Sequence, residues 1–315
     1  MSVKRYYTPE SARNSKGLTL LFAHCIGAHK EQWEPTIQRI FERHHSQVHE
    51  AWAVDWQTHG DSAVLNRELL ETSPSRMYGV SAFEWAEAVA AFMRSPHLKG
   101  KRIVPIGHSA GAGTMVLTTR DFPSSALEQY TSLILIEPTI IPRDLFYLEI
   151  DERVSTMEFV VAATLVRREK WPSREAAHAW LSRRVPWDSW DPRVLRMLSQ
   201  YGLEDTPDGG VAIKGDRRQE ALSYADAEPH FVAAQELRNI STKVPVHFIW
   251  GKDSPLVPEF VQEALAEGVA ASVTRVQGGH MIVQEQPDNI ADAICGVLDT
   301  IGGKDNARVQ HASKL

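Results

Sequence analysis

Short apolar runs recur along the first part of the chain, and segments with apolar residues at helical spacing separate them. Runs of this length are typical of strands buried on both faces of a parallel sheet. The predicted strands are Thr19–Ala23, Glu50–Val54, Ile103–Ile106 and Ser132–Ile136. The predicted helices between them are Gln32–Arg43, Phe83–Met93 and Ala110–Arg120. Because strand and helix signals alternate, we expect an α/β fold with a mostly parallel sheet that helices cover on both faces.

This alternation is interrupted in the middle of the chain. From about Thr139 to Asn239 helical patterns dominate, and no strong strand signal occurs. The later strands are expected at Val244–Trp250 and Ser272–Val276, and the later helices at Pro258–Glu267 and Pro287–Ile301. An insertion of about a hundred residues between two strands is too long for a structureless loop. We therefore predict a core of residues 1–138 and 240–301 and an inserted helical lid at 139–239.

The predicted lid is rich in tryptophan, with Trp171, Trp180, Trp187 and Trp190. Such residues either line a substrate pocket or form the core of the segment that carries them. Because large aromatic side chains are mostly buried in their own domain, we favour the second interpretation for each of them.

Composition narrows the class of protein. The chain has 315 residues, 43% of them hydrophobic, which suits a large α/β domain with an insertion. A formal net charge of −6, without a basic cluster, argues against a nucleic-acid-binding protein. Two cysteines, Cys25 and Cys295, do not make a disulfide framework. No apolar leader and no long apolar run occurs, so we expect neither a secretory signal nor a membrane span.

The last residues carry a targeting motif. Residues 302–315 begin as a polar, glycine-rich segment, for which we predict a flexible tail. The tail ends in Ser313-Lys314-Leu315, which is a peroxisomal import address. This motif predicts a peroxisomal location and an import receptor as a partner.

The most specific chemical motif is Gly107-His108-Ser109-Ala110-Gly111. It follows a predicted strand and opens a predicted helix, and Gly-x-Ser-x-Gly in that setting is a nucleophile elbow. The turn holds the serine in a strained backbone conformation, so small neighbours are needed to avoid clashes. We predict that Ser109 is a nucleophile at the carboxyl edge of the sheet.

A serine hydroxyl needs a base and an orienting acid. His280 follows the last predicted strand in Gly279-His280, and the order serine, acid, histidine fits this type of site. Two carboxylates are candidates for the acid, because each follows a predicted strand. Asp253 stands at the commoner position and Glu137 at an alternative one, and the residues favour Asp253 only slightly.

The negative charge that develops on a carbonyl oxygen during acyl transfer requires N–H donors. One donor is expected from Ala110, directly after the nucleophile, and the other from the loop after His24. Ile26 is the preferred residue in that loop, and Ala28 is the alternative.

Other chemistries lack their motifs. Gly111 and Gly113 lie at the start of a helix instead of in a dinucleotide-binding turn, and no Gly-Lys-Ser/Thr phosphate loop occurs. No paired His/Cys spacing indicates zinc, so we expect no metal and no cofactor. Cys25 is interpreted as a small buried residue and not as a nucleophile.

These motifs together resemble the α/β-hydrolase superfamily from about Thr19 to Ile301. The loop His24-Cys25-Ile26-Gly27-Ala28 with Trp33 resembles, more narrowly, fungal peroxisomal hydrolases of secondary metabolism. That group includes AK-toxin biosynthesis hydrolases, a peroxisomal lipase and an acyl-CoA hydrolase of mycophenolic acid synthesis. Members of the group carry a C-terminal import address and can place the acid where this chain has Glu137, which brings Glu137 to near parity with Asp253. Relatives often have a small or polar residue at the position of Ile26.

The resemblance implies a serine hydrolase that cleaves an ester or an acyl-CoA thioester of toxin or polyketide metabolism through an acyl-enzyme on Ser109. Its substrate is then a small acyl compound. Hydrolysis of C–C bonds, acyl transfer, and lyase or cyclisation steps are alternatives on the same fold. A ligand-binding protein without catalysis is the least favoured of the hypotheses, because the serine and the histidine are both present.

Overall fold

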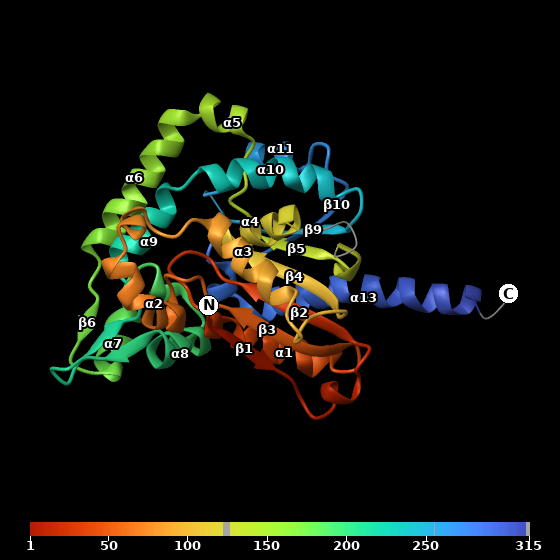
Figure 1. Cartoon of the computed structure of the whole chain (residues 1–315), viewed down its shortest axis with the longest axis horizontal. Coiled ribbons are helices and arrows are strands. Elements are labelled where there is room, and N and C mark those ends of the chain that lie inside the picture. Colours follow the sequence, from red (N-terminus) through yellow and green to blue (C-terminus); the bar gives the residue numbers. More distant parts are fainter. Residues whose placement is uncertain (122–126, 255, 313–315) are drawn as a thin grey trace.

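The structure is a computed structural model that describes residues 1–121, 127–254 and 256–312. In this part of the chain seven strands form one sheet in the order β1-β3-β2-β4-β5-β9-β10 (Figure 1). Strand β1 (Val3–Tyr6) runs antiparallel to its neighbour, and the other pairs are parallel. The parallel strands are β2 (Leu18–Ala23), β3 (Val48–Val54), β4 (Arg102–His108), β5 (Leu133–Ile136), β9 (Val246–Gly251) and β10 (Ala271–Val276).

The predicted parallel strands all coincide with observed ones, which confirms the mostly parallel sheet. Strand β1 was not predicted, because Lys4 and Arg5 break the apolar pattern. The strand lies at the edge of the sheet, so its side chains are only partly buried. A one-sided edge strand therefore carries a weaker apolar signal than a central parallel strand.

Alternate side chains of each strand pack on opposite faces of the sheet. Leu133 and Leu135 of β5 belong to one core cluster, and Ile134 and Ile136 belong to the other. The first face is covered by α3 (Ala82–Met93), α4 (Ala110–Leu117), α10 (Glu228–Ile240) and α11 (Glu259–Ala266). The second is covered by α1 (Glu34–His44), α12 (Ile282–Glu285) and α13 (Pro287–Ala312).

Further helical segments connect these layers. Helix α2 (Gly60–Thr72) follows β3 and was not predicted, because few of its apolar residues are buried. The 3₁₀ segments are η1 (Ser11–Arg13), η2 (Lys30–Trp33), η3 (Pro74–Tyr78), η4 (Thr118–Asp121), η5 (Leu127–Gln129) and η6 (Trp187–Ser189).

The segment between β5 and β9 contains helices, as predicted, and also a small antiparallel sheet. Its helices before α10 are α5 (Arg143–Leu148), α6 (Ile150–Val166), α7 (Arg174–Leu181), α8 (Pro192–Tyr201) and α9 (Arg217–Ala225). The sheet has the order β6-β8-β7 and consists of Lys170–Trp171, Val211–Ile213 and Leu203–Asp205. The expectation of helices without strands is wrong here, because strands of two and three residues are too short to show alternation.

This inserted segment has a core cluster of its own. Trp171 and Trp190 are buried in that cluster, and Trp180 and Trp187 pack against it. The four tryptophans therefore serve the packing of the segment, which is the interpretation that the sequence favoured. Helix α10 differs from the rest of the segment, because it packs on α4 within the main core.

The described end of the chain is helical, within the segment for which the sequence predicted a flexible tail. Helix α13 continues to Ala312 and extends away from the other elements in Figure 1. The predicted import address Ser313-Lys314-Leu315 lies outside the described residues.

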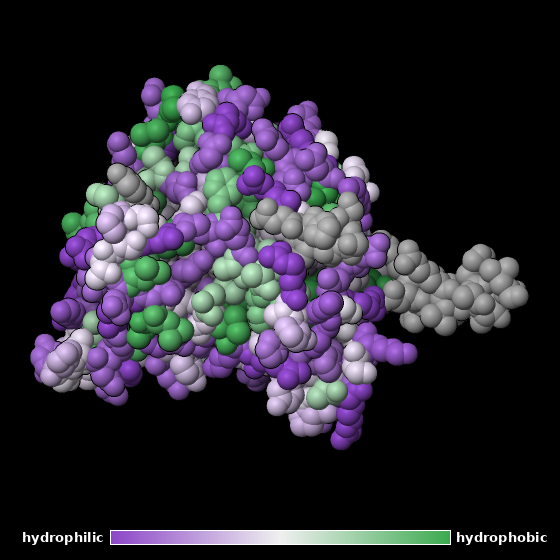
Figure 2. Space-filling view, viewed as in Figure 1, coloured by the Kyte–Doolittle hydropathy of each residue, from purple (hydrophilic) through white to green (hydrophobic). Residues whose placement is uncertain are grey.

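The surface is mostly hydrophilic on the face that Figure 2 shows. Isolated hydrophobic residues lie among the polar ones, some of them at the margin where Figure 1 draws α5 and α6. Tyr147 and Leu148 of α5 and Phe159 and Val166 of α6 are exposed. No helix in the described ranges combines the length and the apolar character that crossing a bilayer requires.

Candidate active site

The turn between β4 and α4 holds Ser109 in a strained conformation. Its backbone has φ 56° and ψ −120°, which side-chain-bearing residues rarely adopt. A Cβ atom on Gly107 would lie 2.3 Å from the carbonyl oxygen of Gly111, and one on Gly111 would lie 2.5 Å from that of His24. Both flanking glycines are therefore required by space, and the predicted elbow geometry is present.

Three side chains form a continuous hydrogen-bonded chain at this edge of the sheet. His280 Nε2 lies 2.9 Å from Ser109 Oγ, and His280 Nδ1 lies 3.1 Å from Glu137 Oε2. The backbone is connected as well, because the N–H of Ser109 donates to the carbonyl of Ile136 at 2.9 Å. When Nδ1–H donates to the carboxylate, Nε2 is left to accept the serine proton.

Glu137 is fully buried directly after β5, with a positive φ of 45°. Its Oε1 accepts the N–H of Gly251 at 2.6 Å, and its Oε2 also accepts the hydroxyl of Ser254. Asp253 is exposed, and its carboxylate accepts the side-chain amide of Gln277.

The structure therefore places Glu137, and not Asp253, against the ring of His280. The preference of the sequence for Asp253 is not matched by this geometry. Strand β5 is the direct neighbour of β4, so the residue that follows β5 lies beside the nucleophile turn. Asp253 follows β9, which is one strand further away.

His108 has a role that the sequence analysis did not assign. Its Nε2 lies 2.8 Å from the carbonyl oxygen of His280, so this nitrogen carries the hydrogen and donates. Burial, with a smaller contribution from His280, lowers the pKa of His108 to about 3 and keeps the ring neutral. The only sequence signal was its place between the strand and the nucleophile.

The loop after β2 contains Ile26, which lines the same cavity as Ser109. The carbonyl of Cys25 accepts His24 Nδ1–H at 2.7 Å and the N–H of Ala28 at 3.2 Å. In a trans peptide the next N–H points the opposite way, so that of Ile26 points away from these two donors. Among the hydrogen bonds of the described residues, none uses the N–H of Ile26 or of Ala110. The alternative donor, Ala28, is already engaged.

Two buried histidines fix this loop by accepting hydrogen bonds. His24 Nε2 accepts the N–H of Trp56 at 3.1 Å, and His59 Nε2 accepts the N–H of Gly27 at 3.1 Å. Burial lowers the pKa of His24 to about 4 and that of His59 well below its usual value. Both rings must be neutral to accept, which agrees with these shifts.

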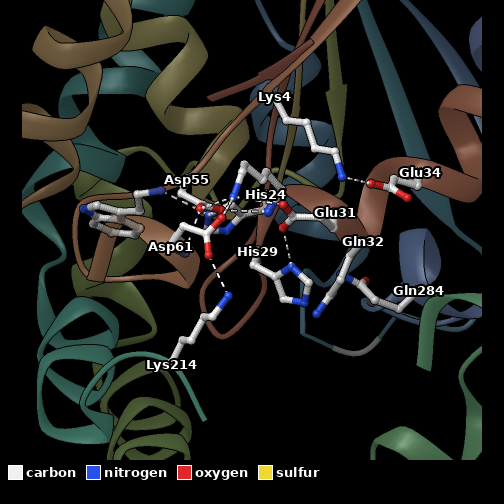
Figure 3. Close-up of polar contacts among 12 residues, drawn as sticks. Lys4, His24, His29, Glu31, Gln32, Glu34, Asp55, Asp61, Lys214 and Gln284 are labelled. Atoms are coloured by element: carbon white, nitrogen blue, oxygen red, sulfur yellow. Dashed lines mark hydrogen bonds and ion pairs between the residues drawn. The ribbon is translucent and has the colours of Figure 1, made fainter. Parts of the chain in front are cut away.

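A buried charged cluster lies next to the same loop (Figure 3). Lys30 Nζ lies 2.9 Å from Glu31, 2.9 Å from Asp55 and 2.7 Å from Asp61. Lys214, from the inserted segment, reaches Asp61 at 2.6 Å. Burial alone would lower the pKa of Lys30, but the three carboxylates outweigh it and raise that pKa. The cluster thus joins the loop after β2 to the insertion.

A cavity of about 280 Å³ opens beside Ser109, Ile26 and His280. Its other walls come from α5, α6, α9 and α10 and from the loop after β9. Most of the lining is apolar, including Ile140, Ile141, Phe146, Met157, Val160 and Phe231. An apolar cavity with few polar groups is typical of small-molecule sites.

Cys25 also lines the cavity, but burial raises the pKa of its thiol to about 12. The thiolate form needed for attack is therefore scarce near neutral pH. Within the described residues, no group of three or more His, Cys, Asp or Glu side chains is arranged to hold a metal ion.

Comparison with known proteins gives two kinds of relatives. A curated relative is the type I acyl-CoA thioesterase mpaH of Penicillium roqueforti, 27% identical over 213 residues. The match covers 64% of this chain, and the chain spans about 44% of that relative's length.

Solved structures share the fold. The peroxisomal alpha-beta-hydrolase Lpx1 of Saccharomyces cerevisiae superimposes with a TM-score of 0.72 at 18% identity, covering 95% of this chain and 81% of Lpx1. The thioesterase domain from the curacin biosynthetic pathway has a TM-score of 0.67 at 17% identity, with 93% and 94% covered. The sequence profile of the alpha/beta hydrolase family matches residues 20–293, and the chain therefore belongs to this family.

Proposed function

We propose that this protein is a serine hydrolase that cleaves esters or acyl-CoA thioesters through an acyl-enzyme on Ser109. The observation that carries the proposal is the hydrogen-bonded chain from Ser109 through His280 to Glu137, at the wall of an apolar cavity. A nucleophile, its base and the group that orients the base are all within hydrogen-bonding distance before any substrate binds.

In the proposed mechanism, Ser109 Oγ attacks the carbonyl carbon of the substrate while His280 Nε2 takes its proton. Glu137 holds the Nδ1–H tautomer and stabilises the imidazolium that forms. The N–H groups of Ile26 and Ala110 donate to the oxyanion. The leaving group departs with the proton from His280, and water then attacks the acyl-enzyme with the same histidine as base.

The thioesterase name of the curated relative supports acyl-CoA thioesters as substrates. Its fungal source, the peroxisomal name of Lpx1 and the tripeptide Ser313-Lys314-Leu315 support a peroxisomal enzyme of fungal secondary metabolism. A fluorescent fusion with and without Leu315 tests the location, because import through this tripeptide requires its last residue.

The test of the chemistry is labelling by a fluorophosphonate probe, followed by mapping of the modified residue. We expect labelling at Ser109 in the wild type and none in Ser109→Ala. Hydrolysis of medium-chain acyl-CoA by Ser109→Ala should fall by about 10⁴-fold or more. Full turnover by that variant would contradict the acyl-enzyme and favour a reaction without a covalent intermediate.

A further inference from the structure

A charged side chain, that of Arg153, lines the same cavity as the serine. Of the described lining residues, Arg153 alone is an Arg, Lys, Asp or Glu. It lies on α6 of the inserted segment, and its side chain is 12% exposed. The proposed mechanism gives Arg153 no role, so the presence of a cation among apolar lining residues has to be explained separately.

The partners of Arg153 within the protein do not satisfy its guanidinium. Nη2 donates to Glu152 at 2.8 Å, but the side chain of Glu152 is 63% exposed and such surface pairs contribute little. Nη1 lies 3.4 Å from the carbonyl oxygen of Leu256, at the limit of a hydrogen bond. Nε is buried, and no described residue accepts its hydrogen.

A guanidinium has five N–H donors in a planar fork, which matches the two oxygens of a carboxylate or a phosphate. A buried donor that lacks an acceptor, as Nε does here, costs free energy beside apolar side chains. An anion that enters the cavity gains charge-assisted hydrogen bonds in surroundings that contain little water. The position therefore favours a ligand that carries a negative charge at some distance from the group attacked by Ser109.

We propose that the cavity takes acyl substrates with an anionic group and that Arg153 binds this group and so determines specificity. The proposal rests on the hydrolase function proposed above. The shared chemistry is a carboxylate or phosphate oxygen pair, which has two possible sources. One is a carboxylate on the acyl part, and the other is a phosphate of a coenzyme A leaving group.

A matched set of four substrates separates these sources. Octanoyl and ω-carboxyoctanoyl groups are each joined to coenzyme A and to N-acetylcysteamine, which has no phosphate. The enzymes are wild type, Arg153→Met, Arg153→Lys and the control Arg143→Met. Arg143 is a cation of the neighbouring helix α5 that pairs with Glu228 and is not among the described lining residues.

For the substrate that carries the recognised anion, Arg153→Met should lose about 10- to 100-fold in kcat/KM, mostly through KM. Its kcat/KM for octanoyl-N-acetylcysteamine should stay within about 2-fold of wild type. Arg153→Lys should lose less kcat/KM than Arg153→Met for the substrate with the recognised anion. Arg143→Met should leave kcat/KM unchanged for substrates with and without the anion. If kcat/KM falls only for the two substrates with an ω-carboxylate, Arg153 binds the acyl part. If it falls only for the two coenzyme A thioesters, Arg153 binds a phosphate of coenzyme A.

An equal loss for all four substrates would overturn the proposal, because it would show a structural role for Arg153. No loss for any substrate would overturn it as well. Binding gives a readout that does not need turnover: azelate, the diacid of the ω-carboxyoctanoyl substrates, or coenzyme A should raise the Tm of Ser109→Ala, but not that of the double variant with Arg153→Met. Absence of hydrolysis with this Tm difference would reject the proposed function alone, and absence of the difference would reject the role of Arg153.

Discussion

The two sides of Ser109 are built in different ways. On the side proposed for proton transfer, His280 and Glu137 are side chains that follow strands, and Glu137 has a positive φ like the serine itself. On the side proposed for the oxyanion, the expected donors are backbone N–H groups, and neutral buried histidines and a charged cluster hold the loop. The first side depends on a few chemically specific residues, whereas the second depends on hydrogen bonds and ion pairs that hold a loop in place.

Replacing each of the two carboxylates that follow strands, Glu137 and Asp253, by its amide should give the largest difference in kcat. Glu137→Gln should lower kcat by about 10²–10⁴-fold. The N–H of Gly251 keeps the remaining oxygen, so the new amide faces His280 and favours the wrong tautomer. Asp253→Asn is the matched control and should stay within about 3-fold, because that carboxylate contacts Gln277 instead. Steady-state kinetics at pH 8 checks both, and the reverse order of effects would assign the acid to Asp253.

Disruption of the charged cluster should act first on stability. Lys30→Met removes the cation that pairs with the buried carboxylates of Glu31 and Asp55, which should cost about 3–5 kcal/mol of unfolding free energy. Urea titration measures this loss. Lys4→Met is the control, because Lys4 forms a half-exposed pair with Glu34 that is worth about 0–1 kcal/mol.

If both lysine variants lost equal stability, the cluster would not be the element that supports the loop. A smaller decrease in kcat should accompany Lys30→Met, about 10-fold, because Asp55 loses the Lys30 ammonium, and the same carboxylate anchors the loop by accepting the backbone N–H of Lys30. The serine should still react with a fluorophosphonate, since the proton-transfer side is unchanged.

The smallest expected effect is on the pH dependence of stability. His24 and His108 have pKa values of about 4 and about 3 when folded, against about 6.5 when unfolded. Between these values the unfolded chain binds more protons, so the unfolding free energy falls as pH decreases from 6.5 toward 4. Each such histidine contributes a slope of up to about 1.4 kcal/mol per pH unit.

Urea unfolding at pH 7.0, 6.0 and 5.0 measures this slope above the range in which carboxylates titrate. His108→Gln keeps a donor for the carbonyl of His280 and removes one titrating ring. The slope of the unfolding free energy against pH should therefore decrease by up to about 1.4 kcal/mol per pH unit, the contribution of one proton. An unchanged slope would show that His108 has the same pKa in the folded and the unfolded protein.

The sequence predicted the parallel strands because continuous apolar runs are required where both faces of a sheet are covered. It also predicted Ser109 and His280 as a pair, and their side chains lie 2.9 Å apart, because the expected chemistry allows few residue types at those strand ends. It left Glu137 and Asp253 open, since both follow strands. Which carboxylate reaches the ring depends on strand order and on the turn conformation at Glu137, and neither has a clear sequence signal.

The remaining features depend on contacts between distant segments. Strands β6, β7 and β8 are too short to show a period. Arg153 follows Asp151 and Glu152 at the polar start of α6, where an arginine usually faces solvent. Its burial arises from the loop after β9, about a hundred positions along the chain, and only the folded chain brings them together.

The hydrogen bond from the N–H of Ser109 to the carbonyl of Ile136 makes the spacing of nucleophile and acid a property of two adjoining strands. Residues of the inserted segment take no part in that bond. Substitutions on α5 and α6 can therefore change the shape of the cavity while leaving the side chains of Ser109 and Glu137 in place. Evolution on such a scaffold is free to change what is cleaved without rebuilding how it is cleaved.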